Sequence, residues 1–317
     1  MPGQAHNIFP YYVVLTIIAD LLSFFYICQI IFTPIKTAQK IVIAFIRFKL
    51  ALFAAFSTKR AGAYALNLFL TPVRNTPKMI PPIFKEAEQI KMELHPYQLV
   101  GYRWNHPQTK KAMILHGFSS TIMKFDHFVN PLIRQGYEVI AIDAPAHGKS
   151  SGKQLTVLDY KAMIQKTYEE YGPIDAFIAH SFGGLALSLF LKELPNHEKI
   201  KAAFIAPATE TTTALKTFSN FLNIDEAIQK EMEQIILERS GLKASDFSIS
   251  KAAPYIKAQV LWIHDEDDNI TPWADAKVIA QMQLPNFRFM LTKELGHRKI
   301  YRDNKVKKAV FEFLDIS

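Results

Sequence analysis

The chain has 317 residues, 49% of them hydrophobic, which is enough for one α/β domain with a sizeable core and an extension. A single cysteine excludes any internal disulfide and fits a reducing compartment. The formal net charge is +8, but the first 80 residues carry eight lysines and arginines against one aspartate, so the remaining chain is nearly neutral. This distribution excludes a nucleic-acid-binding surface on the main body by charge.

The first apolar segment, residues 8–32, is long enough to cross a bilayer. Asp20 would cost about 2.5–3.5 kcal/mol at the centre of such a span, whereas its fifteen leucine, isoleucine, valine and phenylalanine residues contribute about 4.5–9 kcal/mol. The segment therefore predicts a transmembrane helix. The basic residues that follow it predict that the rest of the chain lies on the cytoplasmic side, in contact with the lipid bilayer.

The next segment, residues 36–60, is apolar but interrupted by basic residues. On a helical wheel Lys36, Lys40 and Arg47 lie apart from most of the large apolar side chains, which are Ile41, Phe45, Phe48 and Leu52. This pattern favours an amphipathic helix on the membrane surface, so that residues 1–60 form one membrane-associating unit. The alternative is that both segments fold onto the main body as a hydrophobic helical extension. Residues 61–89, which include several prolines, are expected to be a linker.

Short apolar runs separated by helix-like segments follow along the main body, residues 90–317. They lie at residues 111–115, 138–142, 175–178, 202–205, 259–264 and 287–291. Strands that alternate with helices predict an α/β fold with a mostly parallel sheet and helices on both faces. Residues that carry chemistry are then expected at the carboxyl ends of these strands.

A serine stands directly after the third of these runs, in the segment from Ala179 to Gly184. Ser181 lies between that run and the helix-like residues 185–191, with the small residues Ala179 and Gly183 two positions away on either side. Small residues are needed there because a tight strand-to-helix turn lifts the serine hydroxyl above the sheet. The pattern predicts a nucleophile elbow, although alanine stands where glycine is usual.

Two further strand ends supply a carboxylate and a histidine. The run 259–264 leads into an acidic stretch that contains Asp265, Asp267 and Asp268, and the last run is followed by His297. The chain order is therefore serine, acid, histidine. Earlier in the chain, residues 111–115 lead into His116-Gly117-Phe118, where a glycine lets the backbone turn and aim an amide at a developing oxyanion.

These motifs together resemble the α/β-hydrolase superfamily, in particular the single-domain bacterial serine hydrolases with a helical cap. The matching segments are His116-Gly117-Phe118, the turn from Asp143 to Ser150, His180-Ser181-Phe182-Gly183-Gly184 and Gly296-His297. The resemblance covers roughly residues 90–317, and the order serine, acid, histidine is typical of this fold. Relatives usually have His-Gly-x-x-Asp after the late strand, which places the acid at Asp268, with Asp267 and Asp265 as alternatives.

The chemistry assigns a separate task to each residue type. His297 would remove the proton of Ser181 during attack, and Asp268 would hold the imidazole in the required tautomer. The backbone amides of Phe118 and Phe182 would stabilise the oxyanion. His116, His147 and His180 are interpreted as structural. No spacing of histidine, cysteine and acidic residues indicates a metal, and no phosphate-binding loop is present, so no cofactor is expected.

Residues from about 207 to 256 predict a helical cap, with helices at 211–223, 225–240 and 244–255. Caps in this fold cover the site. The sequence as a whole predicts a serine hydrolase that cleaves a carboxylic ester or related acyl bond of a small, apolar substrate near a membrane. Thioesterase, peptidase and carbon–carbon hydrolase activities, and a non-catalytic binding protein of the same fold, remain alternatives.

Overall fold

The computed structural model describes residues 37–74 and 79–316, so the expected span at residues 8–32 lies outside the described residues. Among the described helices, none is both long and apolar enough to cross a bilayer. The central element is an eight-stranded sheet with the strand order β1-β2-β4-β3-β5-β6-β7-β8. Its strands are β1 Glu88–Leu94, β2 Tyr97–Trp104, β3 Lys111–Leu115, β4 Glu138–Ile142, β5 Ala176–His180, β6 Lys201–Ile205, β7 Gln259–Asp265 and β8 Phe287–Thr292. This is the expected α/β-hydrolase fold.

The six strands from β3 to β8 are parallel, and each of them begins close to a run identified in the sequence. The hairpin of β1 and β2 is antiparallel and lies at one edge, where β2 pairs with β4. It was not expected. Only alternate residues of β1 are buried, among them Ile90 and Met92, because this edge strand exposes its other face. The sheet therefore begins at Glu88, two residues before the expected start of the main body.

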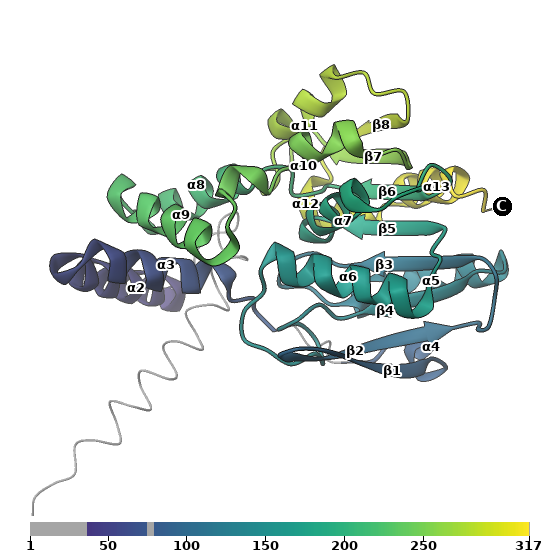
Figure 1. Ribbon diagram of the computed structural model, residues 1–317, viewed down its shortest axis with the longest axis horizontal. Helices are drawn as coiled ribbons and strands as arrows, with labels where there is room; N and C mark the ends of the chain where they lie inside the picture. Colours follow the sequence, from purple (N-terminus) through teal and green to yellow (C-terminus); the bar gives the residue numbers. More distant parts are fainter. Residues whose placement is uncertain (1–36, 75–78, 317) are drawn as a thin grey trace, which may run out of the picture.

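Helices cover both faces of the sheet (Figure 1). One face carries α6 Val157–Tyr171, α7 Phe182–Glu193, α10 Ile249–Ala252 and α11 Trp273–Gln281. The other carries α4 Pro82–Lys85, α5 Asp126–Arg134, α12 Gly296–Lys299 and α13 Asn304–Phe313, with the single-turn helix η4 Ile300–Arg302. The central strands β4 and β5 are buried at every position, as a strand covered on both faces requires.

A third hydrophobic core lies beside the sheet and joins four helices, which we call the cap unit (Figure 1). Two of them, α8 Thr211–Leu222 and α9 Glu226–Ser240, follow β6, as the sequence predicts for a cap, with short helices between α9 and β7. The other two, α2 Thr37–Phe56 and α3 Thr58–Leu70, come from the N-terminal part of the chain.

The prediction of a linker over residues 61–89 is wrong for its first ten residues, which belong to α3. Ser57 ends α2 and caps α3 by accepting a hydrogen bond from the Arg60 amide. Ala61 and Ala65 are fully buried, and a Cβ on Gly62 would lie 2.5 Å from the Glu231 Cβ of α9. Small residues thus let α3 pack closely on a helix that lies far away in the sequence.

Candidate functional site

Ser181 lies at the junction of β5 and α7 in a backbone conformation that few non-glycine residues adopt, with φ 54° and ψ −122°. The turn requires glycine at position 183 because the following helix lies close to the sheet. A Cβ there would lie 2.7 Å from the carbonyl oxygen of His116. Ala179 is fully buried within β5. The turn therefore accommodates a methyl group where the family usually has glycine.

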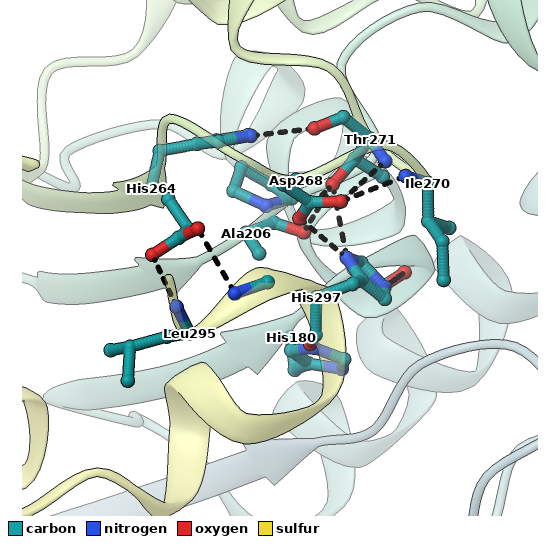
Figure 2. Close-up of polar contacts among 12 residues, drawn as sticks. His180, Ala206, His264, Asp268, Ile270, Thr271, Leu295 and His297 are labelled. Atoms are coloured by element: carbon teal, nitrogen blue, oxygen red, sulfur yellow. Dashed lines mark hydrogen bonds and ion pairs between the residues drawn. The ribbon is translucent and has the colours of Figure 1, made fainter. Parts of the chain in front are cut away.

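His297 connects Ser181 to Asp268. Its Nε2 atom lies 3.0 Å from Ser181 Oγ, and its Nδ1 atom lies 2.8 Å from Asp268 Oδ2. All three side chains are buried. Figure 2 shows the imidazole of His297 between the Asp268 carboxylate and the ring of His180. The three residues expected to act together are thus within hydrogen-bond distance, although 116 and 29 positions separate His297 from its two partners.

The Asp268 carboxylate is fixed by its own loop. Oδ1 accepts hydrogen bonds from the backbone amides of Ile270 and Thr271, both at 2.9 Å. The Thr271 hydroxyl donates to Oδ2 at 2.9 Å and lies 3.1 Å from His297 Nδ1. Burial opposes ionisation, but the hydrogen bond and charge of His297, together with the bonds from Thr271, hold the pKa of Asp268 below its usual value.

Thr271 was not identified from the sequence as part of this site. A threonine three residues after an aspartate is a common local capping arrangement, so a signal was present in the acidic loop. Figure 2 shows Thr271 beside the Asp268 carboxylate. Thr271 therefore contacts both the Asp268 carboxylate and the His297 imidazole.

Asp265 has different hydrogen-bond partners from Asp268. It is fully buried, whereas its neighbour Glu266 is exposed. Its two carboxylate oxygens accept bonds from the Gly296 and Leu295 amides at 2.9 and 3.1 Å and from the Thr292 hydroxyl at 2.7 Å. Burial raises the pKa of the carboxyl, but these bonds outweigh it and leave the pKa below its usual value. Asp265 thereby ties the end of β7 to the loop that presents His297.

Asp267 lies outside this arrangement. Its Oδ2 atom accepts a hydrogen bond from the Glu294 amide at 3.0 Å, in an exposed part of the loop. Of the three acidic candidates, Asp268 is the one that contacts His297.

The loop after β3 runs past Ser181. A Cβ on Gly117 would lie 2.9 Å from the Ser181 Cβ and 2.9 Å from His180 Nδ1, so only glycine fits there without displacement. The Phe118 and Phe182 rings meet edge to face at 5.6 Å between centroids. The Phe182 amide is the first of α7, and the first N–H groups of a helix have no acceptor within it.

Two histidines hold this loop in place. His116 Nδ1 donates to the Gly117 carbonyl at 2.8 Å, and His116 Nε2 accepts a bond from the Ala144 amide at 2.9 Å. His147 Nε2 accepts a bond from the Ser119 amide at 2.8 Å. Burial lowers the pKa of His116 to about 4 and that of His147 to about 3, so both rings are neutral and can accept. This fits their interpretation as structural residues.

His180 lies directly behind the site. Its Nε2 atom donates to the His297 carbonyl at 3.1 Å, and its ring lies 4.7 Å from the His297 ring. Within the described residues, its Nδ1 atom is buried without a hydrogen-bond partner. Burial, and then repulsion from His297, lowers the pKa of His180 well below its usual value. His180 therefore supports the backbone of His297 as a neutral ring.

The described residues contain no cluster of three or more histidine, cysteine, aspartate or glutamate side chains that could hold a metal ion.

Comparison with known proteins agrees with the fold. Residues 106–243 match the family described as serine aminopeptidase, S33. An esterase from Pyrococcus furiosus is 21% identical and superposes with a TM-score of 0.58, over 78% of this chain and 97% of that one. A monoacylglycerol lipase from Paleococcus ferrophilus is 22% identical, with a TM-score of 0.54 over 69% and 99% of the two chains.

The thioesterase domain from the curacin biosynthetic pathway is 15% identical, with a TM-score of 0.52 over 72% of this chain and 99% of that domain. No curated protein matches the chain in sequence. At these identities the structural likenesses establish the fold and leave the substrate open. The structural likenesses and the family match over residues 106–243 show that the chain has the α/β-hydrolase fold.

Proposed function

We propose that the protein is a serine hydrolase that cleaves an acyl ester through a covalent acyl-enzyme. The observation that carries this proposal is the buried chain of contacts from Ser181 Oγ through the two ring nitrogens of His297 to Asp268 Oδ2, at 3.0 and 2.8 Å. A serine hydroxyl is a weak nucleophile at neutral pH, and an imidazole whose tautomer is fixed by a carboxylate activates it.

In the first half of the reaction, Ser181 Oγ attacks the acyl carbon while its proton passes to His297 Nε2. The carbonyl oxygen becomes an oxyanion, which the backbone amides of Phe118 and Phe182 would stabilise; one such donor contributes about 2.7–4 kcal/mol. The carbon–oxygen bond to the leaving alcohol then breaks as His297 returns the proton to that oxygen. Water repeats the sequence on the acyl-enzyme and releases the carboxylic acid.

The substrate is proposed to be a small, apolar acyl ester near a membrane. The esterase and the monoacylglycerol lipase of similar fold support ester cleavage, and the aromatic pair Phe118 and Phe182 beside the serine supports an apolar acyl group. The apolar sequence of residues 8–32 supports a membrane setting, with the enzyme on the cytoplasmic side.

Labelling with a fluorophosphonate tests the nucleophile directly. We expect one adduct, mapped by peptide mass to Ser181, and its complete loss in Ser181→Ala. Ser188→Ala is the matched control, because Ser188 lies on the same helix and its hydroxyl donates to the Leu185 carbonyl, away from His297. An adduct that persists in Ser181→Ala, or no adduct on the folded protein, contradicts the proposal, and the second result would favour a non-catalytic binding protein.

Matched substrates separate the remaining alternatives. The same acyl group is offered as a p-nitrophenyl ester, a thioester and an anilide, and chain length is varied within the ester series. We expect the esters to give the highest kcat/KM, with a rise as the acyl chain lengthens. Higher kcat/KM for the thioester or for the anilide would assign thioesterase or peptidase activity to the same residues, as the curacin domain and the matched family suggest.

A further inference from the structure

The outer face of α2 carries a continuous apolar surface, which we call the α2 stripe. It consists of large side chains spaced four, three, four and four residues apart, so they lie along one side of the helix. Their exposed fractions are 66% for Ile41, 38% for Phe45, 64% for Phe48, 46% for Leu52 and 78% for Phe56. Five of the twelve large hydrophobic side chains exposed on the described residues thus belong to one helix.

The orientation of α2 is fixed by its opposite face. Ile43, Ile46 and Leu50 are buried in the core of the cap unit, and Ile46 is fully buried. Arg47 Nη2 donates to the Phe221 carbonyl at 2.8 Å and so binds the last turn of α8. Since one face is held by these contacts, the stripe cannot turn inward without unpacking the cap unit.

Positive charge borders the stripe. At about 100° per residue, Lys49 lies at one margin, and Lys40 and Arg47 lie at the other, beyond a row of alanines. Residues 37–70 contain no aspartate or glutamate, and of their further basic residues Lys59 pairs with Glu238 of α9 at 3.6 Å. An apolar face bordered by lysine and arginine is the pattern of helices that lie in the surface of a bilayer containing anionic lipids.

We propose that the α2 stripe docks on an anionic lipid bilayer with the helix axis parallel to the membrane. A stripe of this form can lie flat on a bilayer surface, because it runs along a helix of 20 residues, about 30 Å in length. The apolar run of residues 8–32 ends only four residues before α2 begins, which places α2 beside any membrane that this run enters. A second copy of the chain is a poorer occupant, because two stripes face to face would bring together basic residues of the same sign.

Docking would place the cap unit, and not only the N-terminal helix, against the membrane. The core that holds α2 also includes α8 and α9, and Phe118, in the loop after β3, packs against it. In the part of this inference that rests on the proposed function, the substrate is an acyl ester dissolved in that bilayer.

A fluorescent probe on the stripe tests the docking without reference to activity. In the full chain, Cys28→Ser removes the only cysteine, and Phe48→Cys is labelled with an environment-sensitive dye. The protein is reconstituted with vesicles of equal parts phosphatidylcholine and phosphatidylglycerol, or of phosphatidylcholine alone. The control is Val278→Cys on α11. Val278 is 49% exposed, and α11 connects β7 to β8, at the other end of the sheet from β1.

We expect a blue shift and at least a twofold quenching by brominated lipid at position 48, with neither at position 278. Both signals should weaken in vesicles without phosphatidylglycerol. Equal signals at the two positions, or none at 48, would overturn the proposal. A blue shift at position 48 without quenching by brominated lipid would also overturn the proposal. If that blue shift rises with protein concentration, a second copy of the chain covers the stripe. If it is independent of protein concentration, residues 8–32 cover the stripe.

Leu52→Cys repeats the measurement on the same face if labelling at position 48 disturbs the fold. Failure of the proposed hydrolase activity would appear separately, as absent ester turnover by the unlabelled protein. The two failures can therefore be distinguished.

Discussion

Replacing Asp268 by asparagine should abolish most of the activity while the fold survives, because the structure dictates how the new amide must lie. Oδ1 of Asp268 faces two backbone N–H donors, from Ile270 and Thr271. An amide NH₂ group placed there would oppose both donors, so it must take the position of Oδ2, 2.8 Å from His297 Nδ1.

The NH₂ group then donates to His297 Nδ1, which must lose its proton and leave it on Nε2. A protonated Nε2 faces Ser181 Oγ at 3.0 Å and cannot act as its general base. In serine proteases of the trypsin type, the same aspartate-to-asparagine change stabilises the wrong tautomer and lowers kcat about 10⁴-fold. We therefore expect a loss of about 10³–10⁴ in kcat, or about 4–5.5 kcal/mol of barrier.

Asp265→Asn should behave in the opposite way. Both of its oxygens accept bonds from backbone amides, so either orientation of the new amide leaves a buried donor against a donor, at a cost of about 1–3 kcal/mol of folding free energy. The tautomer of His297 is unaffected. We therefore expect a fall in Tm of several degrees, about 2–4 °C per kcal/mol, with less than a tenfold loss of kcat.

Ester turnover and thermal unfolding are measured on both variants, with Asp267→Asn as the control because that carboxylate accepts one bond in an exposed loop. The reasoning would be refuted if Asp267→Asn caused the greatest loss of kcat, or if Asp268→Asn kept at least a tenth of the activity.

Two further predictions concern stability. Since burial lowers the folded-state pKa of His116, His147 and His180, the unfolded chain binds more protons below its histidine pKa of about 6.5. The free energy of unfolding should fall as the pH drops below about 6.5, by up to about 4 kcal/mol per pH unit; urea titrations at several pH values with a flat profile from about pH 7 to 5 would contradict this. Gly62→Ala should push α3 away from Glu231 and lower Tm, and differential scanning calorimetry that finds Tm unchanged would show that the two helices separate freely.

The sequence was sufficient to predict the parallel strands and the chain order of Ser181, Asp268 and His297, because each of these residues follows an apolar run that is readable by itself. It was not sufficient for Asp265. The bonds of that carboxylate reach Gly296, 31 positions away, and no local pattern distinguishes them from solvation of an acidic loop. The helix α3 escaped prediction for the same reason, since its partner α9 lies more than 150 residues further along the chain.

Residues 36–60 were expected either to lie on a membrane or to pack on the main body, and the structure of α2 is compatible with both at once. One face of α2 is packed into the cap unit and the other is exposed. Deleting residues 1–60 would therefore remove Ile43, Ile46 and Leu50 from a core in which truncating one such side chain to alanine costs about 2–5 kcal/mol. Loss of activity in that deletion would then reflect collapse of the cap unit, whereas loss of membrane binding would also follow from removal of the α2 stripe itself, so the deletion cannot separate the two roles. Single substitutions on the exposed face, such as Phe48, separate the two roles because they leave the packed face untouched.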